Sequence, residues 1–140
     1  MTSHLLNGVR VIEMTEVWAG PMGSSLLGDL GADVIKVESF PRTPAISRPL
    51  REGSTVPGDG PPYERSAGHH IANRNKRDVA INIRNEDGAE ALRRLIASAD
   101  VFIEAYSAGT IDDQSRLSLA QHRSRQSTTD DTIVARHCRA

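Results

Sequence analysis

The chain has 140 residues, of which 38% are hydrophobic and 25% charged, and its formal net charge is -1. This length and composition suit one domain with a modest core. The near-neutral charge argues against a nucleic-acid partner or an anionic membrane surface, which need a basic surplus. Cys138 is the single cysteine and cannot form an internal disulfide, and no apolar run has the length of a signal peptide or membrane span. We therefore expect a cytoplasmic protein.

The first elements form a strand, a helix and a second strand. "GVRVIEM", from Gly8 to Met14, is short and β-branched and predicts a buried strand. "PMGSSLLGDLG" predicts a helix that starts near Pro21 and ends at a left-handed Gly31. Its apolar residues recur at helical spacing and are Met22, Leu26, Leu27 and Leu30. "DVIKVE", from Asp33 to Glu38, predicts a second, parallel strand.

The next segment, residues 39–70, contains every proline after Pro21 and predicts a long irregular loop, typically a functional or mobile one. "DVAINI", from Asp78 to Ile83, then predicts a third strand. "NEDGAEALRRLIASA" predicts a helix, and "DVFIEAY" from Asp100 to Tyr106 a fourth strand. Alternating strands and helices indicate an α/β fold, a Rossmann-like parallel sheet with flanking helices. With four strands the sheet is incomplete at one edge.

The C-terminal segment, residues 114–140, has a different character. It contains no aromatic residue, glycine or proline and is rich in Ser, Arg, Gln and Thr. This composition predicts an irregular, disordered tail after an α/β region at residues 5–113. We also expect that a frameshift or early stop replaced the α/β continuation after about Asp113. The other reading frames of the encoding DNA would show that continuation.

The turn "TEVWAGPMG" follows the first strand at its carboxyl end, where open α/β sheets bind ligands. The small residues Ala19 and Gly20 let a ligand approach the backbone, and helix N-terminal amides favour anions. The alternative is a hydrophobic turn in which Trp18 packs against the core. The phosphate-binding glycine patterns G-x-G-x-x-G and G-x-x-x-x-G-K-[ST] do not occur. Glu38 at the end of the second strand therefore supports a dinucleotide site only weakly.

Two other motifs favour modest interpretations. His69 and His70 are adjacent but have no third ligand at useful spacing, so we expect no metal site. "NRNKR", residues 73–77, is basic but lacks interleaved aromatic residues. A phosphate contact or a solvated loop is the expected role, rather than binding of nucleic acid.

Four stretches together resemble one protein family, the family III CoA-transferases. They are "LLNGVRVIEMTEVWAGPMGSSLLGDLGADVIKVE", the proline-rich loop after it, "NRNKRDVAINIRNEDGAEALRRLIASADV" and the "IEAYSAG" that follows, and the likeness runs from about Leu5 to Gly109. V-x-A-G-P, L-G-A-D-V-I-K-V-E and N-x-N-K-R occur at family spacing. The resemblance implies coenzyme A as a substrate, with no covalently bound cofactor. It also implies acyl-CoA and carboxylate partners and a homodimer in the family.

The resemblance also implies a set of CoA-binding residues. The turn residues Val17, Trp18 and Ala19 match positions beside the CoA thioester. The segment Ile81, Asn82, Ile83 and Arg84 matches positions at the adenosine end, and Ala105, Tyr106 and Ser107 match positions near the pantetheine and phosphates. The family often has a basic phosphate contact where Ser39 stands here, and Arg42 is a candidate to replace it.

This chain departs from the family pattern in two ways. Family members read E-N-F-x-P-G where this chain reads E-A-Y-S-A-G. The family's catalytic aspartate, which forms a mixed anhydride with the acyl group, lies in a later region with no counterpart here. The aspartates Asp112, Asp113, Asp130 and Asp131 do not stand in its motif. We therefore expect a transferase relative without catalytic residues of its own and inactive alone, unless a second chain supplies the nucleophile. The alternative is a non-catalytic remnant with a partial CoA-binding half-fold.

Overall fold

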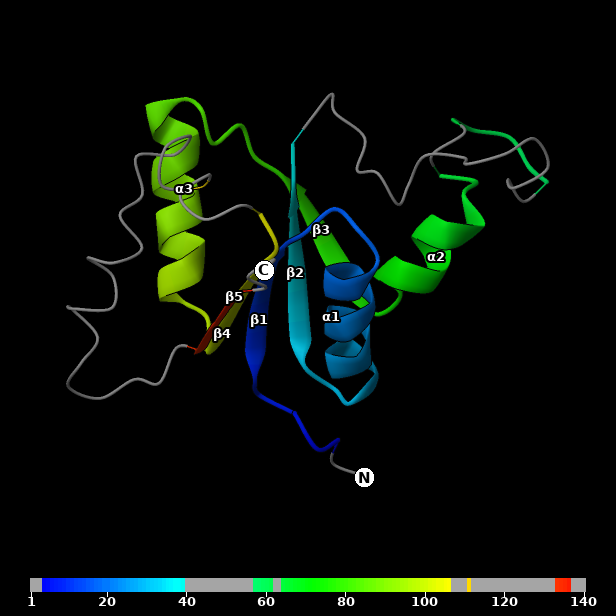
Figure 1. Ribbon diagram of the computed structural model, residues 1–140, viewed down its shortest axis with the longest axis horizontal. Coiled ribbons are helices and arrows are strands. Elements are labelled where there is room, and N and C mark those ends of the chain that lie inside the picture. The colour runs from blue at the N-terminus through cyan, green and yellow to red at the C-terminus, as the bar shows by residue number, and fades with distance from the viewer. Residues whose placement is uncertain (1–3, 40–56, 62–63, 107–110, 112–132, 137–140) are drawn as a thin grey trace.

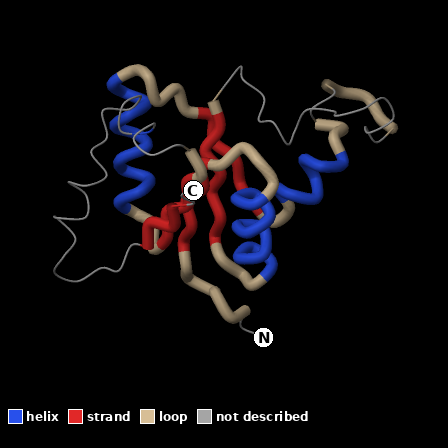
Figure 2. Tube along the Cα trace, in the orientation of Figure 1, coloured by secondary structure: helices blue, strands red, loops and turns tan. Residues whose placement is uncertain are grey.

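The computed structural model describes residues 4–39, 57–61, 64–106, 111 and 133–136. A sheet of five strands in the order β3-β2-β1-β4-β5 forms the centre, and all of its neighbouring pairs are parallel. Helices α1 and α2 lie on one face of this sheet and α3 on the other (Figures 1 and 2). The expected α/β, Rossmann-like class is therefore confirmed. The elements are β1 (Arg10–Met14), α1 (Ala19–Asp29), β2 (Asp33–Glu38), α2 (Ala67–Asn73), β3 (Lys76–Ala80), α3 (Glu86–Ala97), β4 (Val101–Glu104) and β5 (Ile133–Arg136).

Several expected boundaries agree with the structure and others move by two residues or so. β2 has the expected bounds, and Gly31 has the left-handed backbone (φ 98°) expected after α1. α1 begins at Ala19, ahead of Pro21. β3 begins at Lys76 and ends at Ala80, earlier than expected, so the segment from Ile81 to Arg84 has left the sheet.

Two short elements lie within the segments expected to be irregular. Helix α2 occupies the end of the segment expected to be irregular, and its N-terminus is capped by the Ser66 side chain, which accepts from His69 N at 3.3 Å. Strand β5 lies within the tail expected to be disordered and pairs in parallel with β4, from Val101↔Ile133 to Glu104↔Arg136. β4 would otherwise be a sheet edge with unpaired backbone groups. Residues 112–132 and 137–140 of the tail lie outside the described part of the chain.

The face of the sheet under α3 is apolar. Ile12 of β1, Phe102 of β4, and Leu92 and Ile96 of α3 are fully or almost fully buried there in one cluster. The Asn85 side chain caps α3 by accepting from Gly88 N at 2.7 Å. This face is the main hydrophobic core and holds α3 against the carboxyl half of the sheet.

The face under α1 is partly polar, although Leu27 of this helix packs against an apolar cluster. Ser24 and Ser25 of α1 are buried, whereas Leu26 is 55% exposed. A Cβ added to Gly28 would lie 2.8 Å from the Asn75 carbonyl oxygen. Small residues therefore face inward because α1 lies close to the start of β3, and because the sheet beneath it carries charged side chains.

Candidate functional site

The candidate site lies at the carboxyl edge of the sheet, where β1 and β4 end side by side. With the strand order β3-β2-β1-β4-β5, the chain runs outward in opposite directions from β1 and β4, and ligands of open α/β sheets bind at such a point. Residues that follow the two strands meet there: Tyr106 Oη donates to Glu16 Oε1 at 3.4 Å. Tyr106 N also donates to Glu104 Oε2 at 2.9 Å, which fixes the backbone after β4.

The turn between β1 and α1 presents two large apolar side chains to solvent. Val17 is 54% exposed and Trp18 48% exposed, so the alternative of a Trp18 packed into the core is wrong. Gly20 follows in the first turn of α1, where an added Cβ would collide with the Thr15 side chain. No residue larger than glycine fits this contact without moving the turn. An exposed apolar tip thus stands on a tightly packed base.

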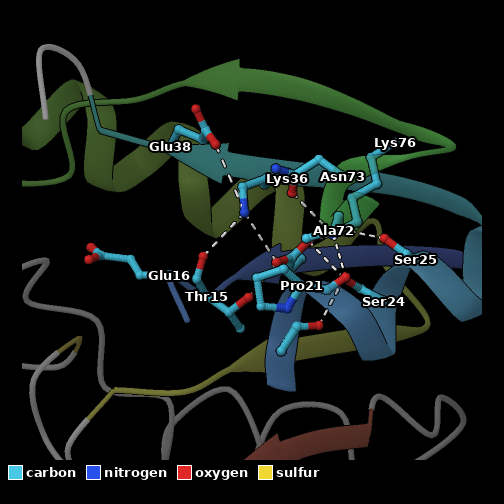
Figure 3. Close-up of polar contacts among 12 residues, drawn as sticks. Thr15, Glu16, Pro21, Ser24, Ser25, Lys36, Glu38, Ala72, Asn73 and Lys76 are labelled. Carbon is cyan, nitrogen blue, oxygen red and sulfur yellow. Dashed lines mark hydrogen bonds and ion pairs between the residues drawn. The ribbon is translucent and has the colours of Figure 1, made fainter. Parts of the chain in front are cut away.

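Below this turn lies a buried ionic cluster that joins three strands (Figure 3). The Glu13 carboxylate of β1 contacts Lys36 of β2 through Oε1 at 3.3 Å and Lys76 of β3 through Oε2 at 2.8 Å. All three side chains are fully buried. Ser24 Oγ also donates to Glu13 Oε2, at 2.8 Å, and Thr15 Oγ1 donates to Glu13 Oε1. We call Glu13, Lys36 and Lys76 the charged hub.

The hub sets the protonation of its members. Burial would raise the pKa of Glu13, but the neighbouring ammonium groups of Lys36 and Lys76 and the hydrogen bonds from Lys76 and Thr15 hold it below its ordinary value. Burial lowers the pKa of Lys76, against the attraction of Glu13. Burial also raises the pKa of Glu38, whose Oε1 lies 3.9 Å from Lys36 Nζ. The hub therefore holds an ionised carboxylate between two cations.

The basic motif at residues 73–77 is used for internal contacts. Arg74 Nη2 lies 2.6 Å from Asp29 Oδ2, and this interaction, with burial opposing it, lowers the pKa of Asp29. Asn75 has a left-handed backbone (φ 57°) and donates to Asp29 Oδ1 at 2.8 Å. Lys76 belongs to the hub, and Arg77 Nε donates to Asp33 Oδ1 at 3.1 Å. The motif is therefore not a solvated loop: its contacts tie β3 to α1 and β2.

Sequence and structure comparisons agree on a family. Residues 6–128 match the sequence profile of CoA-transferase family III. The chain belongs to that family. It is 38% identical over 110 residues to a succinyl-CoA:glutarate CoA-transferase of Mus musculus, covering 77% of this chain and 23% of the relative. It is 37% identical over 112 residues to a formyl-CoA:oxalate CoA-transferase of Streptomyces coelicolor, covering 80% of this chain and 25% of the relative.

A solved structure gives the same result for the fold. The chain superposes on a CAIB/BAIF family protein from Brucella suis with a TM-score of 0.74 and 34% sequence identity, covering 94% of this chain and 32% of that one. The chain therefore spans about a quarter of the length of the curated CoA-transferases it matches. The family match extends to residue 128, beyond the boundary expected at residue 113.

The family resemblance assigned three segments to CoA, and the structure brings the described ones to one edge of the sheet. The turn with Val17, Trp18 and Ala19 follows β1, while Ala105 and Tyr106 follow β4 beside it. The segment from Ile81 to Arg84 follows β3, two strands away from β1. Arg42 and Ser107 lie outside the described residues.

Within the segment after β3, the side chains have different surroundings. Ile81 and Ile83 are half-buried and pack against the apolar cluster under α3, whereas Asn82 and Arg84 are exposed. Ile81 N donates to Glu38 O at 2.9 Å, and Arg84 N to Asn82 Oδ1 at 3.2 Å. Asn82 and Arg84 are therefore the more exposed members of this segment.

The charged hub is the part of the site that sequence reasoning missed. Glu13 and Lys36 each stand in the middle of an otherwise apolar strand, "VIEM" and "VIKV". Parallel pairing places them opposite each other, in the register Glu13↔Lys36. Opposite charges at the centres of two consecutive buried strands were the available signal, because such charges are rarely buried unless they are paired.

Other features lie away from this edge. A cleft of about 540 Å³ at the amino ends of the strands is lined in part by Arg10, Asp33 and Asp100.

Within the described ranges, His, Cys, Asp and Glu side chains form no group of three that could hold a metal ion. The side chain of His69 instead contacts an amide: the Asn73 amide nitrogen lies 3.0 Å from His69 Nδ1. In the same part of the chain, every helix is too short or too polar to cross a membrane.

Proposed function

We propose that this chain forms the CoA-binding part of a cytoplasmic CoA-transferase that moves CoA between an acyl-CoA and a carboxylic acid. The observation that carries the proposal is the exposed Val17–Trp18 tip beside Tyr106 at the carboxyl edge of the sheet. A half-exposed apolar surface at a strand switch point suits the methylene and methyl groups of the pantetheine arm and the carbon chain beside the thioester.

Charge at the same edge also favours an anionic ligand. α1 has no acidic side chain in its first turn, so its N-terminal amides and positive dipole end are not neutralised locally. Arg84 is exposed after β3 and offers a guanidinium that can contact phosphate through two parallel hydrogen bonds. These features support a CoA whose thioester lies at the β1 turn and whose phosphates extend toward β3.

We propose that the attacking carboxylate is not among the described residues of this chain. Transfer through an anhydride needs a carboxylate that is free to attack the thioester. Glu13 is buried between two ammonium groups, and Glu16 accepts a hydrogen bond from Tyr106. The family resemblance places the nucleophile in a later region. The second candidate function, a non-catalytic remnant with a partial CoA site, is supported by the replacement of the family's asparagine and proline by Ala105 and Ala108.

The isolated chain should bind CoA with a dissociation constant above about 1 μM, which is less than about 8 kcal/mol of binding free energy. Calorimetric titration measures the constant. Trp18→Ala should weaken binding, because it removes half-exposed apolar surface beside the site. Leu26→Ala, which removes a similarly exposed side chain on the outer face of α1, should leave binding unchanged.

The same chain should produce no new thioester from acyl-CoA donors and excess carboxylate acceptors, as followed by mass spectrometry. Binding that cannot be detected at millimolar CoA, or that Trp18→Ala and Leu26→Ala weaken equally, would contradict the proposed site. Turnover that disappears on changing Asp112, Asp113, Asp130 or Asp131 to alanine would show that the nucleophile lies within this chain.

A further inference from the structure

The turn that carries Val17 and Trp18 is held at both ends by the charged hub. We propose that Lys36 and Lys76 are positioning residues for CoA transfer: they fix the Thr15 and Pro21 carbonyl groups, and so set where the exposed tip stands. This inference rests on the proposed function in one respect, namely that the tip lines the CoA site. The hydrogen bonds from Lys36 to the Thr15 carbonyl and from Lys76 to the Pro21 carbonyl, which we call the two clamps, do not depend on that function (Figure 3).

Lys36 holds the start of the turn. Its Nζ donates to the Thr15 carbonyl oxygen at 3.3 Å and to Glu13 Oε1 at 3.3 Å. The Thr15 side chain donates to the same Glu13 oxygen. Since the Lys36 side chain is fully buried, water cannot replace its ammonium as a donor to Thr15.

Lys76 holds the end of the turn. Its Nζ donates to the Pro21 carbonyl oxygen and to Glu13 Oε2, both at 2.8 Å. Ser24 Oγ, which donates to Glu13, also lies 3.1 Å from the carbonyl oxygens of Gly20 and Pro21. The ammonium of Lys76 therefore reaches from β3, across the sheet, to the first turn of α1.

Both clamps share one carboxylate, so the two ends of the turn are fixed relative to each other. Displacing either carbonyl breaks a charge-assisted hydrogen bond of a buried ammonium, and the contact of Gly20 with Thr15 leaves no room for the turn to collapse inward. Val17 and Trp18 project beyond these anchors. Transfer reactions are sensitive to misplacement of about 1 Å, so a fixed base for the tip has a direct chemical use.

The test compares Lys76→Met with Arg77→Met in the full chain. Met keeps a long apolar stem at both positions but removes the cation. Arg77 is the matched control, because it is ion-paired with Asp33 on the opposite face of the sheet. Two amides report the result by hydrogen exchange: Met22 N, bonded to Trp18 O in the first turn of α1, and Ala89 N, bonded to Asn85 O in the first turn of α3.

In Lys76→Met we expect the protection of Met22 to fall at least about tenfold, or 1.4 kcal/mol, with Ala89 unchanged. The fluorescence anisotropy of Trp18, the chain's one tryptophan, should fall as the tip gains local motion. Arg77→Met should change neither signal. Equal loss of protection at Met22 and Ala89, or no change at Met22 and Trp18, would overturn the proposal. If Lys76→Met does not fold, Lys76→Gln, which removes the charge but keeps an N–H donor group, serves in its place with the same readouts.

A CoA titration of the same variants separates this inference from the proposed function. If the wild-type chain binds CoA, Lys76→Met should raise the dissociation constant about tenfold and Arg77→Met should not. If the wild-type chain does not bind CoA while Met22 and Trp18 respond as expected, the proposed function fails and the clamp stands. If Lys76→Met lowers the protection of Met22 and leaves the affinity for CoA equal to that of the wild type, the positioning role is overturned.

Discussion

Glu13→Gln should lower the free energy of unfolding by about 3–5 kcal/mol at pH 7, the cost of breaking a buried ion pair by removing one partner. The neutral amide leaves Lys36 and Lys76 buried without the carboxylate that compensates their charge. Urea denaturation followed by circular dichroism measures the loss. Because domains are stable by only about 5–15 kcal/mol, the variant should be partly unfolded at mild denaturant concentrations.

The pH dependence of this variant follows from the lowered pKa of Glu13. In the folded chain Glu13 stays ionised below its ordinary pKa of 4.5, so the unfolded chain binds more protons there. The wild type should keep this contribution above pH 4.5 and lose it as the pH falls through the folded-state value. Glu13→Gln should lose less stability over that acidic window. Glu90→Gln is the control, since Glu90 is half exposed and paired with Arg93 at the surface. A similar loss in both variants, below about 1 kcal/mol, would contradict the role of the hub.

Phe102→Ala should lower the free energy of unfolding by about 3–5 kcal/mol, the usual cost of deleting a buried ring. Phe102 is fully buried in the apolar cluster with Ile12, Leu92 and Ile96, so its loss leaves a cavity between β4 and α3. Because the ring carries no charge, the loss should be nearly constant between pH 5 and pH 8. Equilibrium urea titrations at the two pH values measure it.

Leu26→Ala provides the matched control for this deletion, since it removes an exposed apolar side chain of α1. Its effect should lie within about 0.5 kcal/mol. If Phe102→Ala costs no more than Leu26→Ala, then packing under α3 does not hold the sheet together. A strong pH dependence of the Phe102→Ala loss would instead mean that the cavity disturbs the charged side of the sheet.

Local signals predicted the elements that depend on local chemistry. The β-branched run from Asp33 to Glu38 is a strand with those bounds, and Gly31 has the left-handed backbone that only glycine adopts readily. α2 was missed because its sequence, "AGHHIAN", carries no apolar stripe. Its stability comes from the Ser66 cap and from a contact that the sequence does not reveal, Ser25 Oγ with the Ala72 carbonyl oxygen.

The remaining differences arise from contacts between distant residues. The helical spacing of apolar residues predicted the helix α1 but not the side chains that it buries. Ser24 is buried because the sheet beneath the helix carries Glu13, to which it donates a hydrogen bond. β5 pairs with the edge of β4 through residues that lie far along the chain, with Ile133 opposite Val101 and Val134 opposite Phe102. The hub requires the strand order, since Lys76 reaches Glu13 across β2. The α/β class, by contrast, could be predicted from the alternation of strands and helices along the sequence alone.

The position of β1 at the centre of the sheet has a consequence for synthesis on the ribosome. Arg10 N donates to Asp100 Oδ2, which lies 90 positions further along the chain. At about 5–20 residues per second, β1 waits on the order of 5–20 s for its second neighbour. Glu13, Lys36 and Lys76 all emerge before β4 is made, and β1, β2 and β3 pair among themselves. The base of the turn can thus assemble cotranslationally, on a half-sheet whose other edge is still open.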